Sequence, residues 1–201
     1  VTLPITKHNF IVKSVEGLAD ILRNAFQTAM SGRKGPVLVD IPKNVFEECA
    51  KYIPAKPAVS SIPLPAVSSL GEAAELINAS SKPVLCLGGG VIASNAAEAA
   101  YAFAKRLGAP VMTTAMGIGG FPQDDDQYLG LAGLQPNPSV LAALRDCDLF
   151  IGAGVRFSER MLQNIRGSSP DCKILHLDID EAEIGKNLPV YEYGGDIIVV
   201  D

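Results

Sequence analysis

Beyond residue 65, short apolar runs alternate with amphipathic segments, and this alternation limits the possible folds more than any other feature of the chain. The apolar runs predict four strands, over residues 83–90, 110–114, 149–152 and 173–180. The segments around them predict helices over residues 70–77, 97–108, 138–144 and 181–184. Continuous apolar strands that alternate with helices form a parallel sheet covered on both faces. The sequence therefore predicts an α/β protein with a Rossmann-like parallel sheet and helices on both faces.

A different pattern precedes this region. Ser14 can cap a helix whose apolar face runs from Leu18 to Ala29, and the run PVLVDIP then predicts one short buried strand. Residues 55–65, AKPAVSSIPLP, are rich in proline and serine and predict an extended linker. We therefore expect residues 1–54 to be a helix–strand remnant of another domain, and residues 66–201 to be a second domain. The chain is expected to be a piece of a longer polypeptide.

Composition excludes several classes of function. The formal charge is -5 with no basic run, which argues against a nucleic-acid surface, and no apolar run is long enough for a membrane span. The four cysteines are irregularly spaced and form no CxxC pair, which argues against a zinc site. Cys49 and Cys86 are expected to be buried or half-buried small side chains in a reducing cytoplasm.

The predicted strand ends carry residues suited to a nucleotide. In an open parallel sheet, ligands bind outside the carboxyl ends of the strands. The four candidate ends are Gly88-Gly89-Gly90, Thr113-Thr114-Ala115, Gly154-Val155-Arg156 and Asp178-Ile179-Asp180. Glycines allow close backbone approach, and a helix capped by Ser94 would point its positive end toward a phosphate. Arg156 would neutralise the phosphate, and Asp178 would accept hydrogen bonds from ribose or ribityl hydroxyls.

The run LFIGAGVRFSER, residues 149–160, is the most informative of these ends. Its apolar strand leads into Gly152 and Gly154, and Arg156 and Arg160 follow. Taken singly, each glycine fits a tight turn, and Asp178 fits a cap for the helix near Glu181. Taken together, the set predicts a dinucleotide site, although no strict G-x-G-x-x-G motif is present.

Other candidates are weaker. The run Asp124-Asp125-Asp126 could suggest magnesium, but after Pro122 it is more typical of a solvated turn. His176 lies inside a predicted strand and is expected to be a packed core residue. The sequence contains no G-x-S-x-G, P-loop or H-E-x-x-H motif.

Six segments, read in order, resemble the large subunits of acetolactate synthases (acetohydroxyacid synthases). They are ITKHNFIVKSVEGL, SGRKGPVLVDIPKNV, GGGVIAS, TTAMGIGGFP, GVRFSER and LHLDIDEAEIGKN. These enzymes belong to the thiamine diphosphate-dependent superfamily, and the resemblance spans nearly the whole chain. It implies an enzyme of branched-chain amino-acid biosynthesis that decarboxylates pyruvate and joins the two-carbon unit to a second 2-keto acid.

The resemblance also implies domains and a cofactor. Residues 1–54 would be the C-terminal part of the pyrimidine-binding domain, and residues 66–201 the central, DHS-like NAD/FAD-binding domain, which holds FAD. Carried over by motif, the FAD-binding residues would be Arg33, Gly89, Thr114, Ala115, Gly133, Gly154, Val155, Arg156, Phe157, Ser158, Asp178, Ile179, Asp196 and Ile197. Lys43 and Arg160 would lie near the substrate entrance.

Thiamine diphosphate and Mg²⁺ would bind other parts of the full enzyme, since the superfamily's activating glutamate and G-D-G…N motif do not occur in these 201 residues. The chain alone is therefore expected to be inactive, with no catalytic or metal-binding residue. Its expected partners are the rest of its own chain, further copies in a homo-oligomer, and a regulatory subunit, with no nucleic acid or membrane. A cytoplasmic location is expected.

The sequence departs from the family pattern in two places. Gly133-Leu134-Gln135-Pro136 stands where the family commonly has G-M-H-G, and Ser158-Glu159 stands where it commonly has two aspartates. Two alternatives therefore stay open. One is the central scaffold domain of a flavin-independent thiamine diphosphate-dependent decarboxylase or carboligase, and the other is a stand-alone nucleotide-binding module.

Overall fold

The computed structural model describes residues 1–52, 54, 67–133, 135–165, 172–188 and 197–200. The chain divides into two compact units, residues 1–63 and 64–201, which are described separately below. The predicted linker, residues 55–65, lies outside the described residues.

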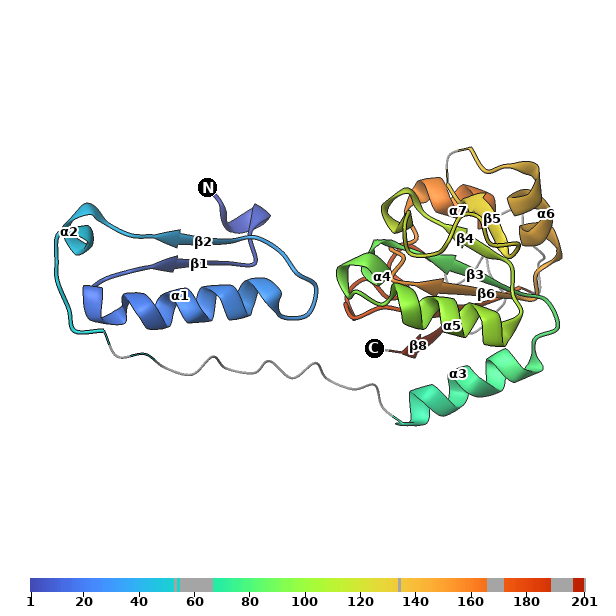
Figure 1. The fold of residues 1–201 in the computed structure, drawn as a ribbon, viewed down its shortest axis with the longest axis horizontal. Helices are drawn as coiled ribbons and strands as arrows, with labels where there is room; N and C mark the ends of the chain where they lie inside the picture. Colours follow the sequence, from blue (N-terminus) through green and yellow to red (C-terminus); the bar gives the residue numbers. More distant parts are fainter. Residues whose placement is uncertain (53, 55–66, 134, 166–171, 189–196, 201) are drawn as a thin grey trace. The chain divides into compact units, whose positions relative to one another are not determined.

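The first unit is a β–α–β element (Figure 1). It contains η1 (Leu3–Ile5), β1 (His8–Ile11), α1 (Val15–Met30), β2 (Val37–Asp40) and α2 (Lys43–Phe46). The strands are parallel, with His8 opposite Val37, and α1 is the crossover between them. The predicted helix and strand are confirmed, whereas β1 was not predicted, because HNFI is short and half polar. Among the described residues, only Val12, Ala25 and Val45 form a buried apolar core here.

The second unit is a six-stranded, wholly parallel sheet in the order β5-β4-β3-β6-β7-β8. Its strands are β3 (Pro83–Leu87), β4 (Val111–Thr113), β5 (Tyr128–Leu131), β6 (Leu149–Ala153), β7 (Lys173–Leu177) and β8 (Ile197–Val200). Its helices are α3 (Val67–Ala79), α4 (Gly89–Ala93), α5 (Ala97–Leu107), η2 (Ala115–Gly117), α6 (Pro138–Asp146) and α7 (Glu159–Ile165). The predicted Rossmann-like α/β class is confirmed.

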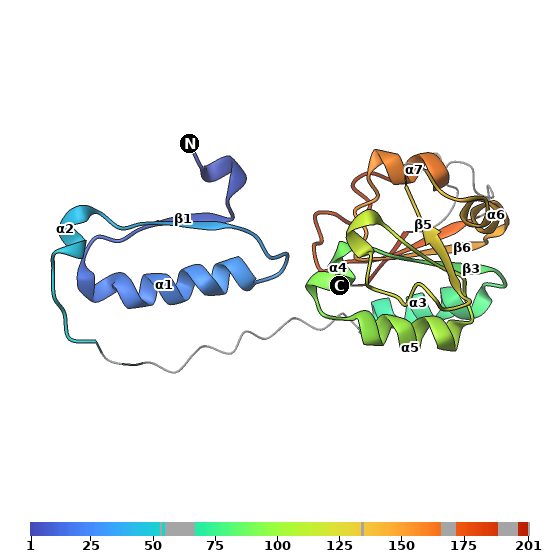
Figure 2. The ribbon, with the colours of Figure 1, turned by 45° about the horizontal axis from the view of Figure 1, so that its top comes forward.

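Helices cover both faces of this sheet, as Figure 2 shows. On one face Ala73, Val91 and Ala104, from α3, α4 and α5, pack against Leu85 and Ile151. On the opposite face α6 and α7 pack against the other side chains of the same strands; these contacts include Val140, Leu144, Met161, Phe150 and Ile174. Because side chains alternate across a strand, both faces are apolar, which explains the continuous apolar runs in the sequence.

Two local predictions are wrong. Ser94 does not cap α5, which begins after Ala96; it ends α4 instead, and its hydroxyl donates a 2.8 Å hydrogen bond to the Gly90 carbonyl. The glycines after β3 allow α4 to begin at once, so Ser94 falls at the end of that helical turn rather than at a start. Residues 181–184 form turns rather than a helix, and Gly185 lies in the left-handed region at φ 67°.

Candidate functional site at the carboxyl edge of the sheet

The order in which the chain adds strands to the sheet reverses between β3 and β6. From β3 the chain proceeds outward to β4 and β5, and it returns to β6 on the other side before continuing to β7 and β8. Leu87 lies opposite both Thr113 and Ala153, and Ala153 lies opposite Leu177, so these four strands end at one edge. The loops after β3 and β6 therefore flank the topological switch point, where ligands of open α/β sheets bind.

The glycines at this point bring two loops together. A Cβ on Gly88 would lie 2.0 Å from the Gly154 carbonyl oxygen, and one on Gly90 would lie 2.6 Å from the Gly154 Cα. The amides of Gly88 and Gly90 donate to the carbonyls of Ala153 and Gly154, at 2.8 and 3.1 Å. The backbone that comes close to Gly88 and Gly90 is thus that of the neighbouring loop. Gly89 faces η2 instead, where its Cβ position lies 3.0 Å from Met116 Cβ.

Arg156 brings a positive charge to this edge. Its side chain is exposed, and among the described residues its guanidinium makes no hydrogen bond or ion pair. Its backbone carbonyl accepts a 3.1 Å hydrogen bond from Asn187 Nδ2, which ties the loop to the segment after β7. A positioned but uncommitted guanidinium is suited to an anionic oxygen of a ligand.

Val155 and Phe157, on either side of Arg156, point inward. Their side chains are 2% and 1% exposed and belong to the core beneath α6 and α7. Any contact of these residues with a ligand would therefore come from the backbone. Gly152 lies in β6, within the predicted strand, and a Cβ there would meet Phe157 Cζ at 2.7 Å. Gly152 makes room for a ring rather than for a ligand.

Asp178 follows β7 at the same edge. Its Oδ1 accepts a 3.0 Å hydrogen bond from the Asp180 amide, so the carboxylate stabilises its own turn. Its Oδ2 lies 3.9 Å from Nε2 of His176. This turn role is the local alternative that the sequence allowed, although the helix it was expected to cap is absent. Since a carboxylate accepts several hydrogen bonds, Asp178 keeps capacity for a ligand hydroxyl.

The remaining predicted residues are distributed as follows. Thr114, Ala115, Gly133 and Ile179 follow the carboxyl ends of β4, β5 and β7, and Ser158 immediately precedes α7. Ile197 begins β8, and Asp196 lies outside the described residues. Met116 and Asn187 also lie at this edge but were not selected from the sequence. Both belong to segments that carried the family resemblance, which is the signal that could have identified them.

Three further predicted residues do not lie in the loops that follow the strands of the second unit. Arg160 is exposed on α7, in the second unit. Arg33, between α1 and β2, and Lys43, the first residue of α2, are exposed in the first unit, and Lys43 pairs with Glu47 at 3.7 Å. The roles suggested for Arg33 and Lys43 stay predictions.

The acidic run after Pro122 forms the predicted turn, but its central residue is not simply solvated. Asp125 is 12% exposed in its side chain, lies 2.6 Å from Lys105 Nζ, and accepts from the Gln127 amide. These contacts lower the pKa of Asp125 through the Lys105 hydrogen bond first and the Gln127 amide second. Within the described ranges, no group of three or more His, Cys, Asp or Glu side chains is arranged to hold a metal ion.

His176 is buried in the core, as predicted from its place in a strand. It is 0% exposed, its ring meets Phe157 edge-on at 4.7 Å, and neither ring nitrogen has a hydrogen-bond partner among the described residues. Burial lowers the pKa of His176, opposed by the carboxylates of Asp178 and Glu183 and by the nearby Val155 backbone. The imidazole is therefore neutral in the folded protein near neutral pH.

This burial predicts acid sensitivity of the second unit. In the unfolded chain His176 binds a proton near pH 6.5, whereas the folded chain resists protonation until a lower pH. The contribution of His176 to the free energy of unfolding is thus fully present above about pH 6.5. It falls as the pH drops toward the folded pKa, by at most about 1.4 kcal/mol per pH unit. We expect His176→Phe to flatten this slope in urea unfolding between about pH 5 and 7.5.

The matched control is His8→Gln, which removes the other histidine, exposed on β1 of the first unit. Its slope for the second unit should equal that of the unchanged chain. If His176→Phe kept the full slope, the buried imidazole would not be its source.

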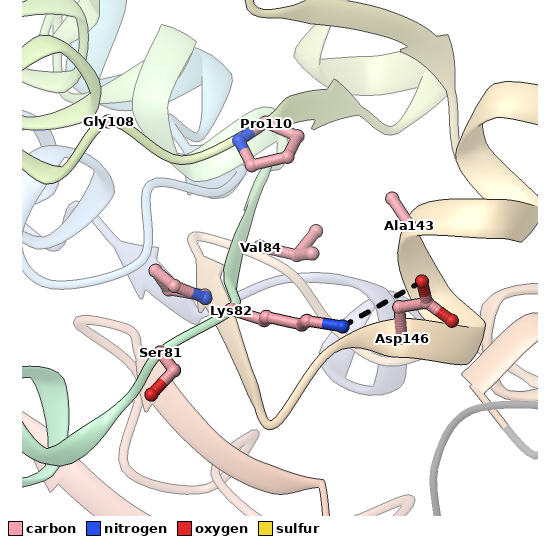
Figure 3. A pocket seen from close by; sticks show the side chains of 8 residues that line it. Ser81, Lys82, Val84, Gly108, Pro110, Ala143 and Asp146 are labelled. Carbon is pink, nitrogen blue, oxygen red and sulfur yellow. Dashed lines mark ion pairs between the residues drawn. The ribbon is translucent and has the colours of Figure 1, made fainter.

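A hollow of about 290 Å³ lies at the opposite, amino-terminal edge of the sheet (Figure 3). Pro83, Val84, Pro110 and Ala143 contribute to its lining, and Lys82 and Asp146 form a 3.9 Å ion pair there. Both charged side chains are well exposed, at 65% and 73%, so the pair is weak. No chemistry-bearing residue predicted from the sequence lies in this hollow.

The chain is similar in sequence to known proteins. Residues 70–199 match the family described as thiamine pyrophosphate enzyme, central domain, and the chain belongs to that family. It is 42% identical over 190 residues to the acetolactate synthase large subunit of Corynebacterium glutamicum, covering 92% of this chain and 30% of that protein. It is 44% identical over 191 residues to an acetolactate synthase of Mycobacterium bovis, covering 93% of this chain and 31% of that protein.

A solved structure is similar in fold. Benzoylformate decarboxylase from Polynucleobacter necessarius aligns with a TM-score of 0.78 and 24% identity, over 98% of this chain and 36% of that one. The chain thus spans about a third of the length of the proteins it matches. In the parts that the structure describes, no helix has the length and apolar character that crossing a membrane requires.

Proposed function

We propose that this chain is the central part of an acetolactate synthase large subunit. The observation that carries the proposal is identity of 42% and 44% to two acetolactate synthases over nearly the whole chain. The complete enzyme would decarboxylate pyruvate and join the two-carbon unit to a second 2-keto acid. Thiamine diphosphate, held with Mg²⁺ by other parts of that enzyme, would supply the carbanion chemistry.

The role of this chain would be to hold a flavin dinucleotide at the carboxyl edge of its sheet. The exposed, uncommitted Arg156 fits a diphosphate, and the remaining acceptor capacity of Asp178 fits a ribose or ribityl hydroxyl. Gly89 and Gly133, which follow β3 and β5 at the same edge of the sheet, are partly exposed. The residues therefore fit FAD, and they would bind and orient it without taking part in a chemical step.

One variant tests this role in the complete enzyme. We expect Arg156→Ala to weaken FAD binding about ten- to hundredfold, because one charge-assisted contact contributes about 1.5–3 kcal/mol. Retained flavin, measured by its absorbance after gel filtration, and flavin affinity, measured by titration, would follow the loss. Acetolactate formation from pyruvate should be restored by excess FAD.

Arg106→Ala is the charge-matched control, because Arg106 is exposed in the last turn of α5, away from the carboxyl ends of the strands. It should leave flavin affinity unchanged. Equal FAD affinities of the two variants would show that Arg156 does not belong to the site. A complete enzyme that makes no acetolactate from pyruvate would refute the proposed activity.

A second candidate keeps the fold and omits the flavin. The contacts of Gly88 and Gly90 with Gly154 account for these glycines without any ligand, and the family pattern is changed at Ser158-Glu159. In that case the domain would be a scaffold of a related decarboxylase or carboligase. A complete enzyme that is active and binds no FAD on titration would favour it.

We also propose a setting for the complete enzyme. Its partners would be the rest of its own chain, further copies in a homo-oligomer and a regulatory subunit, without nucleic acid or membrane. A cytoplasmic location is supported by the absence of a regular cysteine framework.

A further inference from the structure

Two cysteines lie side by side in the core of the second unit. Cys147 follows α6, and Cys172 immediately precedes β7. Their Sγ atoms are 3.1 Å apart, and the residues are only 1% and 3% exposed. Both thiols are reduced, and Cys147 Sγ also donates to the Leu144 carbonyl at 3.1 Å.

Neighbouring strands fix this proximity. In the parallel ladder of β6 and β7, Leu149 lies opposite Lys173, and the Lys173 amide donates a 2.9 Å bond to the Asp148 carbonyl. Cys147 precedes Leu149 by two residues, and Cys172 precedes Lys173 by one. The two thiols are therefore held together by the start of a central strand pair, at the edge opposite the candidate site.

We propose that Cys147 and Cys172 are a redox modification site that forms an intramolecular disulfide with a small-molecule disulfide or peroxide as oxidant. Two S–H bonds break and one S–S bond forms, and two protons and two electrons pass to the oxidant. Oxidised glutathione would leave as two glutathione thiols, and hydrogen peroxide as two waters. Reaching an S–S bond of about 2.05 Å requires the sulfurs to approach by about 1 Å.

A metal ion fits this pair less well. Two sulfurs on one tetrahedral zinc, each at about 2.3 Å, are separated by roughly 3.8 Å, and zinc requires further ligands. The described residues offer no cluster of three or more such ligands. The Cys147–Cys172 separation of 3.1 Å is shorter than this span, so a zinc ion would have to push the two sulfurs apart.

The other two cysteines provide internal references. Cys49 is exposed, contrary to its predicted burial, because the segment after α2 packs against little of its unit. Cys86 is fully buried in β3, as predicted. The neighbouring Cys172 sulfur and burial raise the pKa of Cys147, and burial raises that of Cys86. Because the thiolate is the reactive form, oxidation of the pair should be slow and accelerate with pH.

The test uses the 201-residue chain with Cys49→Ser, which leaves three of its four cysteines. The chain is incubated under native conditions with oxidised glutathione at about pH 8.5. We expect two thiols to be lost with no bound glutathione, and peptide mapping without reductant to show one cross-link, between Cys147 and Cys172. Cys86 should keep its thiol, and dithiothreitol should restore the other two.

Two controls make the result decisive. In the unchanged chain Cys49 should form a mixed disulfide with glutathione, which shows that the oxidant is active. In urea the same oxidation should give mixed pairings that include Cys86. This control compares one chain folded and unfolded, so it tests whether the fold selects the Cys147–Cys172 pair. If both thiols persist in the native chain while Cys49 reacts, or if Cys86 is cross-linked natively, the proposal is wrong.

Discussion

Gly154→Ala is expected to destabilise the second unit by roughly 2–5 kcal/mol, because two independent costs add at one position. Gly154 lies in the left-handed region at φ 60°, where a side chain costs about 1–2 kcal/mol. Its new Cβ would also lie 2.6 Å from Gly90 Cα and 2.9 Å from the Gly90 nitrogen. Both neighbours are backbone, so neither can move aside without disturbing the junction of the loops after β3 and β6.

Gly108→Ala separates the two costs. Gly108 follows α5 at φ 65°, nearly the same conformation, but nothing lies within 4 Å of its Cβ position. It should therefore show the conformational cost alone. Urea unfolding, monitored by hydrogen exchange of peptides that contain β6, measures both variants. Equal destabilisation by the two would show that the contact between the loops contributes nothing.

The sheet could be predicted because its strands are buried on both faces. The runs at 83–87, 111–113, 149–153 and 173–177 are largely apolar, and this pattern identified each of them. The edge of the sheet that carries the candidate site followed from the same alternation, since parallel strands end together. No geometry beyond hydrophobic pattern and chain order was needed for that step.

The elements that were missed depend on contacts that a local pattern does not record. Residues 128–131, β5, form an edge strand that contains Gly130 at φ 118° and pairs with β4 through a register shift. Ser94 has the chemistry of a helix cap, but its position at the end of α4 depends on how early the preceding glycines allow the helix to begin. Both were decided by tertiary context rather than propensity.

The candidate site was predicted as a set of strand ends, while individual side chains were harder to assign. Glycine is equally suited to a ligand, a turn or a neighbouring backbone, and only coordinates show that Gly88 and Gly90 face Gly154. Arg156 and Phe157 are adjacent in a polar-looking loop, yet one is exposed and the other is 1% exposed. That inward turn of Phe157 is possible because its backbone adopts φ 45°.

Phe157→Ala is expected to cost about 3–5 kcal/mol of stability, the usual range for removal of a buried phenylalanine ring. The ring meets Phe150 edge-on at 5.8 Å and His176 at 4.7 Å, which fixes the loop that carries Arg156. A bulky residue at positive φ is strained, so its packing must outweigh a conformational cost of about 1–3 kcal/mol. Phe121→Ala removes a ring that is 3% exposed on the other face of the sheet. Both variants should lower stability, but only Phe157→Ala should also weaken FAD binding.

A double-mutant cycle with Gly152→Ala tests the packing itself. Gly152→Ala alone should destabilise by about 1–3 kcal/mol, because its methyl group would meet Phe157 Cζ at 2.7 Å and Cε2 at 3.0 Å. In the Phe157→Ala background that clash is absent, and the same methyl group enters the space left by the ring. The double variant should therefore be more stable than the sum of the single effects implies, by about 1–3 kcal/mol in urea unfolding. Additivity within about 0.5 kcal/mol would show that Gly152 and Phe157 do not interact, and Gly152 would then need another explanation, such as access for a ligand.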